Sequence, residues 1–75
     1  MKIIKCLHVT QTERKHLAAF LESGRTQAKV NTKYYTILSG TPIGKEYEYE
    51  IRISTPTKRD NGEEVMDNQT IVVRN

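Results

Sequence analysis

The stretch Lys45–Thr55 reads KEYEYEIRIST, and apolar and charged residues alternate along it. The apolar residues of one parity are Tyr47, Tyr49, Ile51 and Ile53. The charged residues of the other parity are Glu46, Glu48, Glu50 and Arg52. Successive side chains of a β-strand point to opposite faces of its sheet, so this pattern predicts an antiparallel strand. One face of the strand lines a core, and the other faces water.

The size of the chain bounds its architecture. A chain of 75 residues buries only about 60% of its unfolded surface, which leaves room for one core. We therefore expect a single domain over residues 1–75. Pairing as a homodimer is one way for such a small domain to bury more apolar surface.

The composition predicts a cytoplasmic protein without a membrane partner. Cys6 is the single cysteine, so no intramolecular disulfide can form, and this fits a reducing compartment. The N-terminal apolar run lacks the cleavage pattern of a signal peptide. No stretch reaches the roughly 20 apolar residues that a membrane-spanning helix needs.

The N-terminal third predicts a strand followed by a helix. Met1–Val9 carries apolar residues at both parities, which is typical of a central strand. Thr10 and Glu13 have the spacing of a capping box, which predicts the start of a helix. Ser23 and Gly24 predict its end, because glycine tolerates the left-handed conformation there. The residues expected in its buried stripe are Leu17, Ala18, Phe20 and Leu21. Those expected to face water are Gln11, Arg14, Lys15 and Glu22.

The middle of the chain predicts a second long strand. Thr26–Leu38 alternates in polarity, with a break near Asn31 left open. The even-numbered residues of this stretch, which include Tyr34, are expected to face the core, whereas Tyr35 is expected to face water. Ser39–Gly44 contains two glycines and a proline and predicts the turn into the next strand.

Charge predicts the register between these two strands. If Tyr34 lies opposite Tyr49, then Lys33 lies opposite Glu50. The alternative register opposes Lys33 to Arg52, and directly opposed like charges destabilise a sheet. We therefore expect the register in which Tyr34 pairs with Tyr49.

The C-terminal third predicts a hairpin. Asp60-Asn61-Gly62 is a strong turn signal, and Gln69–Arg74 predicts the last strand, whose inward parity is ambiguous. The complete pattern predicts a small α+β domain of β-α-β-β-β order. Its sheet is mostly antiparallel, with one helix packed on one face.

The chain offers little for catalysis or metal binding. Cys6, His8 and His16 are its only soft metal ligands, and a zinc site needs several protein ligands that converge. Gly40–Lys45 has three residues between its glycines and leads into a strand, so it lacks the features of a phosphate-binding loop. The glutamate row stands on an open face rather than in a cleft that shifts a pKa. We expect no enzyme, no cofactor and no metal site.

Protein binding is the function that the sequence favours. An exposed tyrosine among ordered opposite charges is suited to docking a protein, and exposed edge strands offer a second route. The expected contact residues on the open sheet face are Lys29, Lys33, Tyr35, Glu48 and Glu50. The small, cofactor-free build is typical of regulatory, accessory and inhibitor proteins of phages and mobile elements. We therefore predict a non-enzymatic protein that docks a macromolecular partner, and favour a protein over a nucleic acid.

Nucleic-acid binding is the alternative function. The chain has 12 basic and 9 acidic residues, for a net charge of +3. Basic side chains on the helix, on the second strand and in the loop 56–62 are suited to phosphate contacts. They are Arg14, Lys15, Arg25, Lys29, Lys33, Lys58 and Arg59. The glutamate row on the neighbouring strand opposes this alternative, because it repels phosphates.

Overall fold

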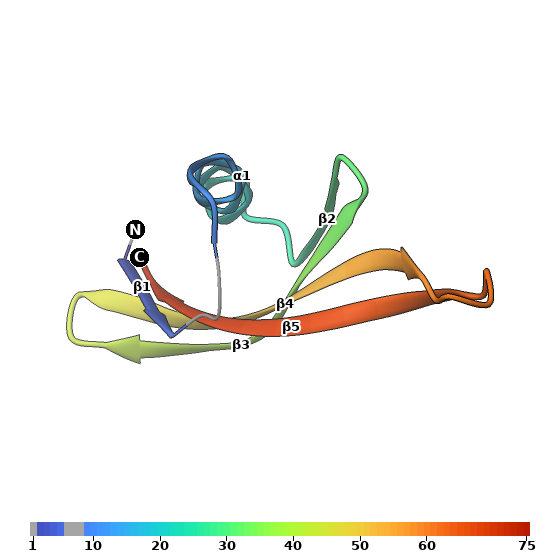
Figure 1. The fold of residues 1–75 in the computed structure, drawn as a ribbon. Coiled ribbons are helices and arrows are strands. Elements are labelled where there is room, and N and C mark those ends of the chain that lie inside the picture. The colour runs from blue at the N-terminus through green and yellow to red at the C-terminus, as the bar shows by residue number, and fades with distance from the viewer. Residues whose placement is uncertain (1, 6–8) are drawn as a thin grey trace.

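The computed structural model describes the backbone of residues 2–5 and all of residues 9–75 (Figure 1). Within these residues, one helix packs on one face of a five-stranded sheet. The strand order across the sheet is β1-β5-β4-β3-β2, and every neighbouring pair is antiparallel. The elements in chain order are β1 (Lys2–Lys5), α1 (Gln11–Glu22), β2 (Gln27–Val30), β3 (Lys33–Ile43), β4 (Glu46–Lys58) and β5 (Glu64–Arg74).

The fold confirms the predicted class and corrects the predicted order. The α+β class, the antiparallel sheet and the single covered face are confirmed. The order β-α-β-β-β was wrong, because the described residues contain one strand more. The central position predicted for Met1–Val9 was also wrong. Strand β1 pairs only with β5 at an edge of the sheet, since apolar content does not set how many neighbours a strand has. The stretch 6–8 lies outside the described residues.

Helix α1 begins and ends where its sequence predicts. Thr10 is the N-cap, and its hydroxyl accepts a hydrogen bond from the backbone N–H of Glu13 at 3.1 Å. Ser23 is the C-cap, and Gly24 follows with a φ of 71°, which glycine adopts without strain. The predicted stripe is confirmed, with Leu17 and Phe20 buried and Ala18 and Leu21 half-buried. The four residues predicted to face water are exposed. In the described part of the chain, no helix is long and apolar enough to span a membrane.

A two-residue turn divides the expected long strand Thr26–Leu38 into β2 and β3. Val30 pairs with Lys33 across this turn, and Asn31 has a φ of 57°, in the left-handed region that asparagine tolerates better than most residues. The break that the sequence left open near Asn31 is therefore a hairpin. Because the strands pair across this turn, Tyr35 lies beside Ala28 on the inner face and Tyr34 lies beside Lys29 on the open face. Tyr35 is accordingly 1% exposed, and Tyr34 is 42% exposed. The predicted orientations of both tyrosines were wrong, because they assumed alternation straight through the turn.

Strand β3 continues through Ile43 and so takes up most of the stretch Ser39–Gly44 that was predicted to be a turn. The turn comprises only Gly44 and Lys45, at the end of that stretch, and Tyr34 pairs with Ser54 instead of Tyr49. The pairing of β3 with β4 shifts register between Ile37 and Ser39, at a β-bulge. Gly40 has a packing role inside the strand. A Cβ atom there would lie 3.3 Å from the Tyr49 ring, so glycine makes room for this ring on the neighbouring strand.

The core lies between α1 and the inner face of the sheet. Its buried side chains are Leu17, Phe20, Tyr35, Ile51, Ile53, Ile71 and Val73. The Phe20 and Tyr35 rings meet at a centroid distance of 5.7 Å, a tilted arrangement that aromatic pairs favour. The inward orientation of Ile51 and Ile53 is confirmed. The core position predicted for Tyr47 was wrong, because this ring stacks on Tyr49 near the β3–β4 hairpin and is 51% exposed.

Strands β4 and β5 extend past the rest of the sheet as a two-stranded arm. Strand β3 pairs with β4 only as far as Ser54, and β1 pairs with β5 only from Val72 onward. We call residues 55–67 the β4–β5 arm; their strand residues pair only with each other. The predicted turn is confirmed at its tip, where the N–H of Gly62 donates to the carbonyl of Arg59 at 2.8 Å. The arm contributes to the elongated outline of 48 × 22 × 21 Å (Figure 1).

Replacing the buried Ile51 tests the placement of the core. We expect Ile51→Ala to lower the free energy of unfolding by about 2–5 kcal/mol, because it leaves a cavity where the sheet meets the helix. The adjacent exposed Arg52 provides the matched control. Arg52→Ala should change the free energy of unfolding by less than about 0.5 kcal/mol. Urea unfolding monitored by circular dichroism measures both variants. Equal effects at the two positions would contradict the assignment of faces.

Candidate functional site

The residues predicted to bind a protein do not share one face. Lys29 and Glu50 are exposed on the open face of the sheet, and Glu48 is half-buried there. Tyr35 is buried in the core, so it is not an exposed contact residue. Lys33 lies on the covered side, where its Nζ donates to the Glu13 carboxylate at 2.7 Å. The parity exchange at the β2–β3 turn explains both corrections.

The open face carries side chains of both charges, of which one pair is joined by an ion pair. Arg74 lies opposite Glu48 and donates to its carboxylate at 3.3 Å. The ammonium group of Lys29 lies 5.4 Å from the centroid of the Tyr34 ring. Arg52 follows the three glutamates of β4 on the same face. The ion pair between Arg74 and Glu48 stabilises the sheet surface modestly.

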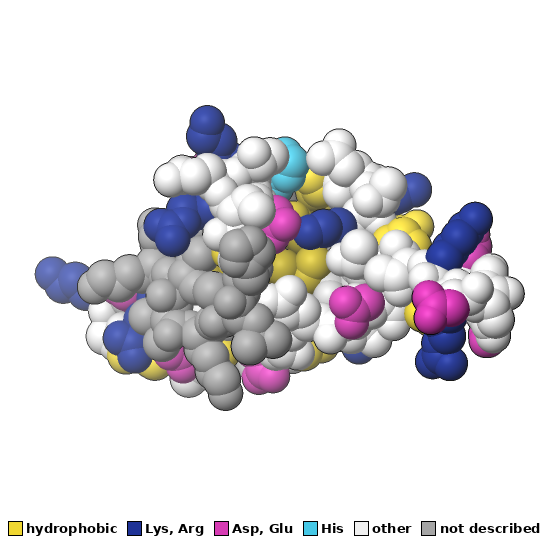
Figure 2. Space-filling model, in the orientation of Figure 1, with side chains coloured by type: hydrophobic (Ala, Val, Ile, Leu, Met, Phe, Trp, Pro, Cys, Tyr) yellow, Lys and Arg dark blue, Asp and Glu magenta, His cyan; other side chains and the backbone are white. Residues whose placement is uncertain are grey.

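The basic residues of the nucleic-acid alternative are dispersed. Arg14 and Lys15 are exposed on α1, whereas Lys58 and Arg59 lie at the far end of the β4–β5 arm. The arm also carries four acidic residues, namely Asp60, Glu63, Glu64 and Asp67. Figure 2 shows basic and acidic side chains scattered together over one face of the molecule. The described residues on that face form no segregated basic stripe.

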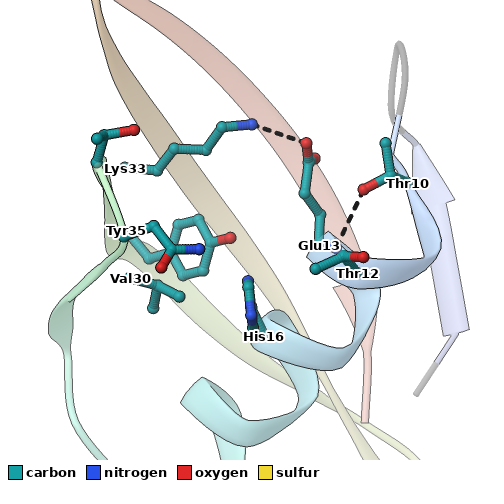
Figure 3. Close-up of a pocket in the computed structure, with 9 residues that line it drawn as sticks. Thr10, Thr12, Glu13, His16, Val30, Lys33 and Tyr35 are labelled. Carbon is teal, nitrogen blue, oxygen red and sulfur yellow. Dashed lines mark hydrogen bonds and ion pairs between the residues drawn. The ribbon is translucent and has the colours of Figure 1, made fainter.

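A groove between α1 and β2 brings together residues of several elements. Its apolar end is lined by His16, Ala19, Phe20, Ser23, Arg25, Ala28 and Val30. Its polar end, a hollow of about 230 Å³, is lined by Thr10, Thr12, Glu13, His16, Val30, Asn31, Thr32, Lys33 and Tyr35 (Figure 3). His16 and Val30 belong to both ends, so the two hollows adjoin. We call them together the α1–β2 groove.

An ion pair spans the polar end of the groove. The Glu13 carboxylate pairs with Lys33 across the hollow, instead of reaching back to Thr10 as the capping-box spacing predicted (Figure 3). The Tyr35 side chain enters the same hollow from β3 (Figure 3). Burial, and to a smaller extent the charge of Glu13, raises the pKa of the Tyr35 phenol above its usual 10.0. The phenol is therefore protonated at neutral pH.

The edge strand β2 forms one wall of the apolar end. Ala28 and Val30 face the groove and are half-buried, whereas Ala19 on the opposite wall is exposed. A second hollow lies along β2, lined by Arg25, Gln27, Ala28, Lys29, Tyr34, Tyr35 and Thr36. Arg25 and Ala28 line this hollow and also the apolar end of the groove. No carboxylate is among the described residues that line either one.

Sequence reasoning missed this site because its residues form no motif. Ala19 and Ala28 are small residues that periodicity places on a helix and on a strand without distinguishing them from their neighbours. The only signal was the break near Asn31, which shortens β2 and brings it to the sheet edge. Comparison of the chain with protein-family models, curated proteins and solved structures gave no match.

The raised pKa of Tyr35 predicts a specific loss of stability at high pH. Above pH 10 the unfolded chain releases the Tyr35 proton, while the folded protein retains it because its pKa is raised. The free energy of unfolding therefore falls as the pH rises from about 10 toward the folded pKa. We expect the free energy of unfolding of the Tyr35→Phe variant to fall less steeply than that of the wild type between pH 9 and pH 11, as measured by urea unfolding. Parallel pH profiles would contradict the burial of this hydroxyl group.

Proposed function

We propose that this protein is a small non-enzymatic binding protein that docks a protein partner through the α1–β2 groove and the adjoining edge of β2. The observation that carries the proposal is the juxtaposition of an edge strand with a groove whose apolar wall residues are only partly covered. Edge strands and partly exposed apolar grooves are the surfaces that proteins use to capture segments of other proteins. A regulatory, accessory or inhibitory role in the cytoplasm belongs to the same proposal.

The state of the polar groups supports binding over catalysis. Tyr35 is held protonated, and the Glu13 carboxylate is engaged by Lys33 at 2.7 Å. A general base needs a free acceptor with a pKa near the working pH. These groups instead hold α1 against β3 and so maintain the width of the groove. The open sheet face, which the sequence favoured as the docking surface, receives less support because neither Tyr35 nor Lys33 lies on it.

Placing a long side chain in the groove tests this proposal. Peptides are selected from a random displayed library on the immobilised protein, and each enriched peptide is measured against two variants. We expect Ala19→Arg to weaken these peptides at least about tenfold, which corresponds to roughly 1.4 kcal/mol. Ala19 is exposed on the helix, and arginine is a good helix former, so the fold should persist.

Thr41 on the open face provides the matched control. Thr41→Arg adds the same side chain opposite Glu48, away from the groove, and should leave peptide affinity unchanged. Thermal unfolding of both variants verifies that they are folded. If no peptides are enriched, or if the enriched peptides bind Ala19→Arg and the wild type equally, the groove is not the docking site.

Nucleic-acid binding has one specific observation in its favour. Arg25 and Lys29 lie together beside β2 and form no ion pair with any described residue. We expect two cations to give at most weak binding, because the affinity of such contacts comes from many phosphates neutralised together. Fluorescence anisotropy of labelled duplex DNA and single-stranded RNA at low and near-physiological salt measures this. Micromolar binding with a steep salt dependence would indicate that the partner is a nucleic acid and not a protein.

A further inference from the structure

We propose that the partner segment is an extended acidic peptide that adds to the free edge of β2 as an antiparallel strand. This inference rests on the binding function proposed above and names the chemistry of its ligand. Three features of the β2 edge carry it: the directions of the backbone groups, the small side chains facing the groove, and the charges around it.

The backbone of β2 offers two residues to a new strand. Val30 and Lys33 flank the two-residue turn, and the N–H of Ile37 donates to the carbonyl of Thr26 at 2.9 Å. Hydrogen-bonded and non-hydrogen-bonded pairs alternate along an antiparallel ladder, so residues 26, 28 and 30 direct their groups toward β3. Gln27 and Lys29 therefore direct both N–H and C=O to the outer edge. An added antiparallel strand would form four backbone hydrogen bonds with these two residues.

The side chains of an added strand would fall on two different surfaces. Those beside Ala28 and Val30 would enter the α1–β2 groove against Ala19 and His16 of the helix. This space suits a branched apolar residue such as valine, because the walls contributed by the two alanines are small. The remaining side chains, beside Gln27 and Lys29, would lie on the open face. The edge thus predicts a segment that alternates apolar and polar residues.

Charge selects an acidic segment. Arg25 lines the hollows on both sides of β2, and Lys29 lines the hollow on the open face. No carboxylate of the described residues lines either hollow, so acidic side chains beside Lys29 would find unpaired cations. A second copy of this chain suits the edge less well. Pairing of two β2 edges would bring Arg25 and Lys29 of both copies together, and like charges across a strand pair are destabilising.

Synthetic peptides test the predicted charge. The probe is the acetylated and amidated hexapeptide EVEVEV, and KVKVKV is its charge-reversed control. We expect EVEVEV to shift and protect the amide resonances of Gln27 and Lys29 in ¹H–¹⁵N NMR spectra, and to bind at least about tenfold more tightly than KVKVKV. Equal binding of the two peptides, or shifts confined to another surface, would overturn the inference.

Reversing the charge of Lys29 provides a rescue experiment. Lys29→Glu should weaken the binding of EVEVEV and strengthen the binding of KVKVKV, because it inverts the charge beside the added strand. Arg59→Glu makes the same charge change at the tip of the β4–β5 arm and should alter neither affinity. If both variants change peptide binding alike, the preference reflects net charge rather than the β2 edge.

Backbone methylation distinguishes strand addition from simple filling of the groove. In the proposed antiparallel register, the glutamate N–H groups of EVEVEV point to β2 and the valine N–H groups point away. N-methylation of the glutamates should abolish binding, whereas N-methylation of the valines should preserve it. If the two methylated peptides bind alike, strand addition is wrong.

The result also separates this inference from the function on which it rests. If the peptides enriched by display depend on Ala19 but EVEVEV does not bind at millimolar concentration, the acidic extended ligand is wrong and the groove function stands. If neither kind of peptide depends on the groove, both are wrong.

Discussion

The two-residue turn at Asn31 and Thr32 is the constraint on which the rest of the structure depends. The left-handed conformation of Asn31 lets Val30 pair with Lys33 and ends β2 after four residues. Pairing across this turn places Tyr35 opposite Ala28, on the side covered by the helix. Tyr35 then meets Phe20 in the core, while Tyr34 faces the open side. A strand that continued through Asn31 would have buried the opposite set of side chains.

The same turn leaves the α1–β2 groove open. Helix α1 buries Leu17 and Phe20 against the inner face of the sheet, and Phe20 anchors it on Tyr35 of β3. Strand β2 lies beside the helix at the sheet edge (Figure 1) and contributes only Ala28 and Val30 to the inner face. These side chains are too small to fill the space next to Ala19. An edge strand and an unfilled apolar wall therefore meet at one place.

Charge divides the surface into two kinds. On the open face, Arg74 and Glu48 lie across from each other and form an ion pair. Around β2, Arg25 and Lys29 line hollows that contain no carboxylate of the described residues, so these two cations have no ion-pair partner there. The net charge of +3 carries no information about this division, because its effect depends on placement. The proposed ligand class follows from the local balance alone.

The sequence by itself determined the α+β class, the limits of α1 and the inward face of the central part of β4. These depend on local rules: Thr10 and Gly24 act within a few residues, and Ile51 and Ile53 alternate within one strand. The tertiary structure alone decided the strand register, the burial of Tyr35, the edge position of β1 and the groove. Periodicity describes one element at a time, whereas the length of a turn decides which parity of the next strand faces inward. The groove depends on missing bulk at Ala19 and Ala28, and only the packing of the helix beside β2 brings these two residues together.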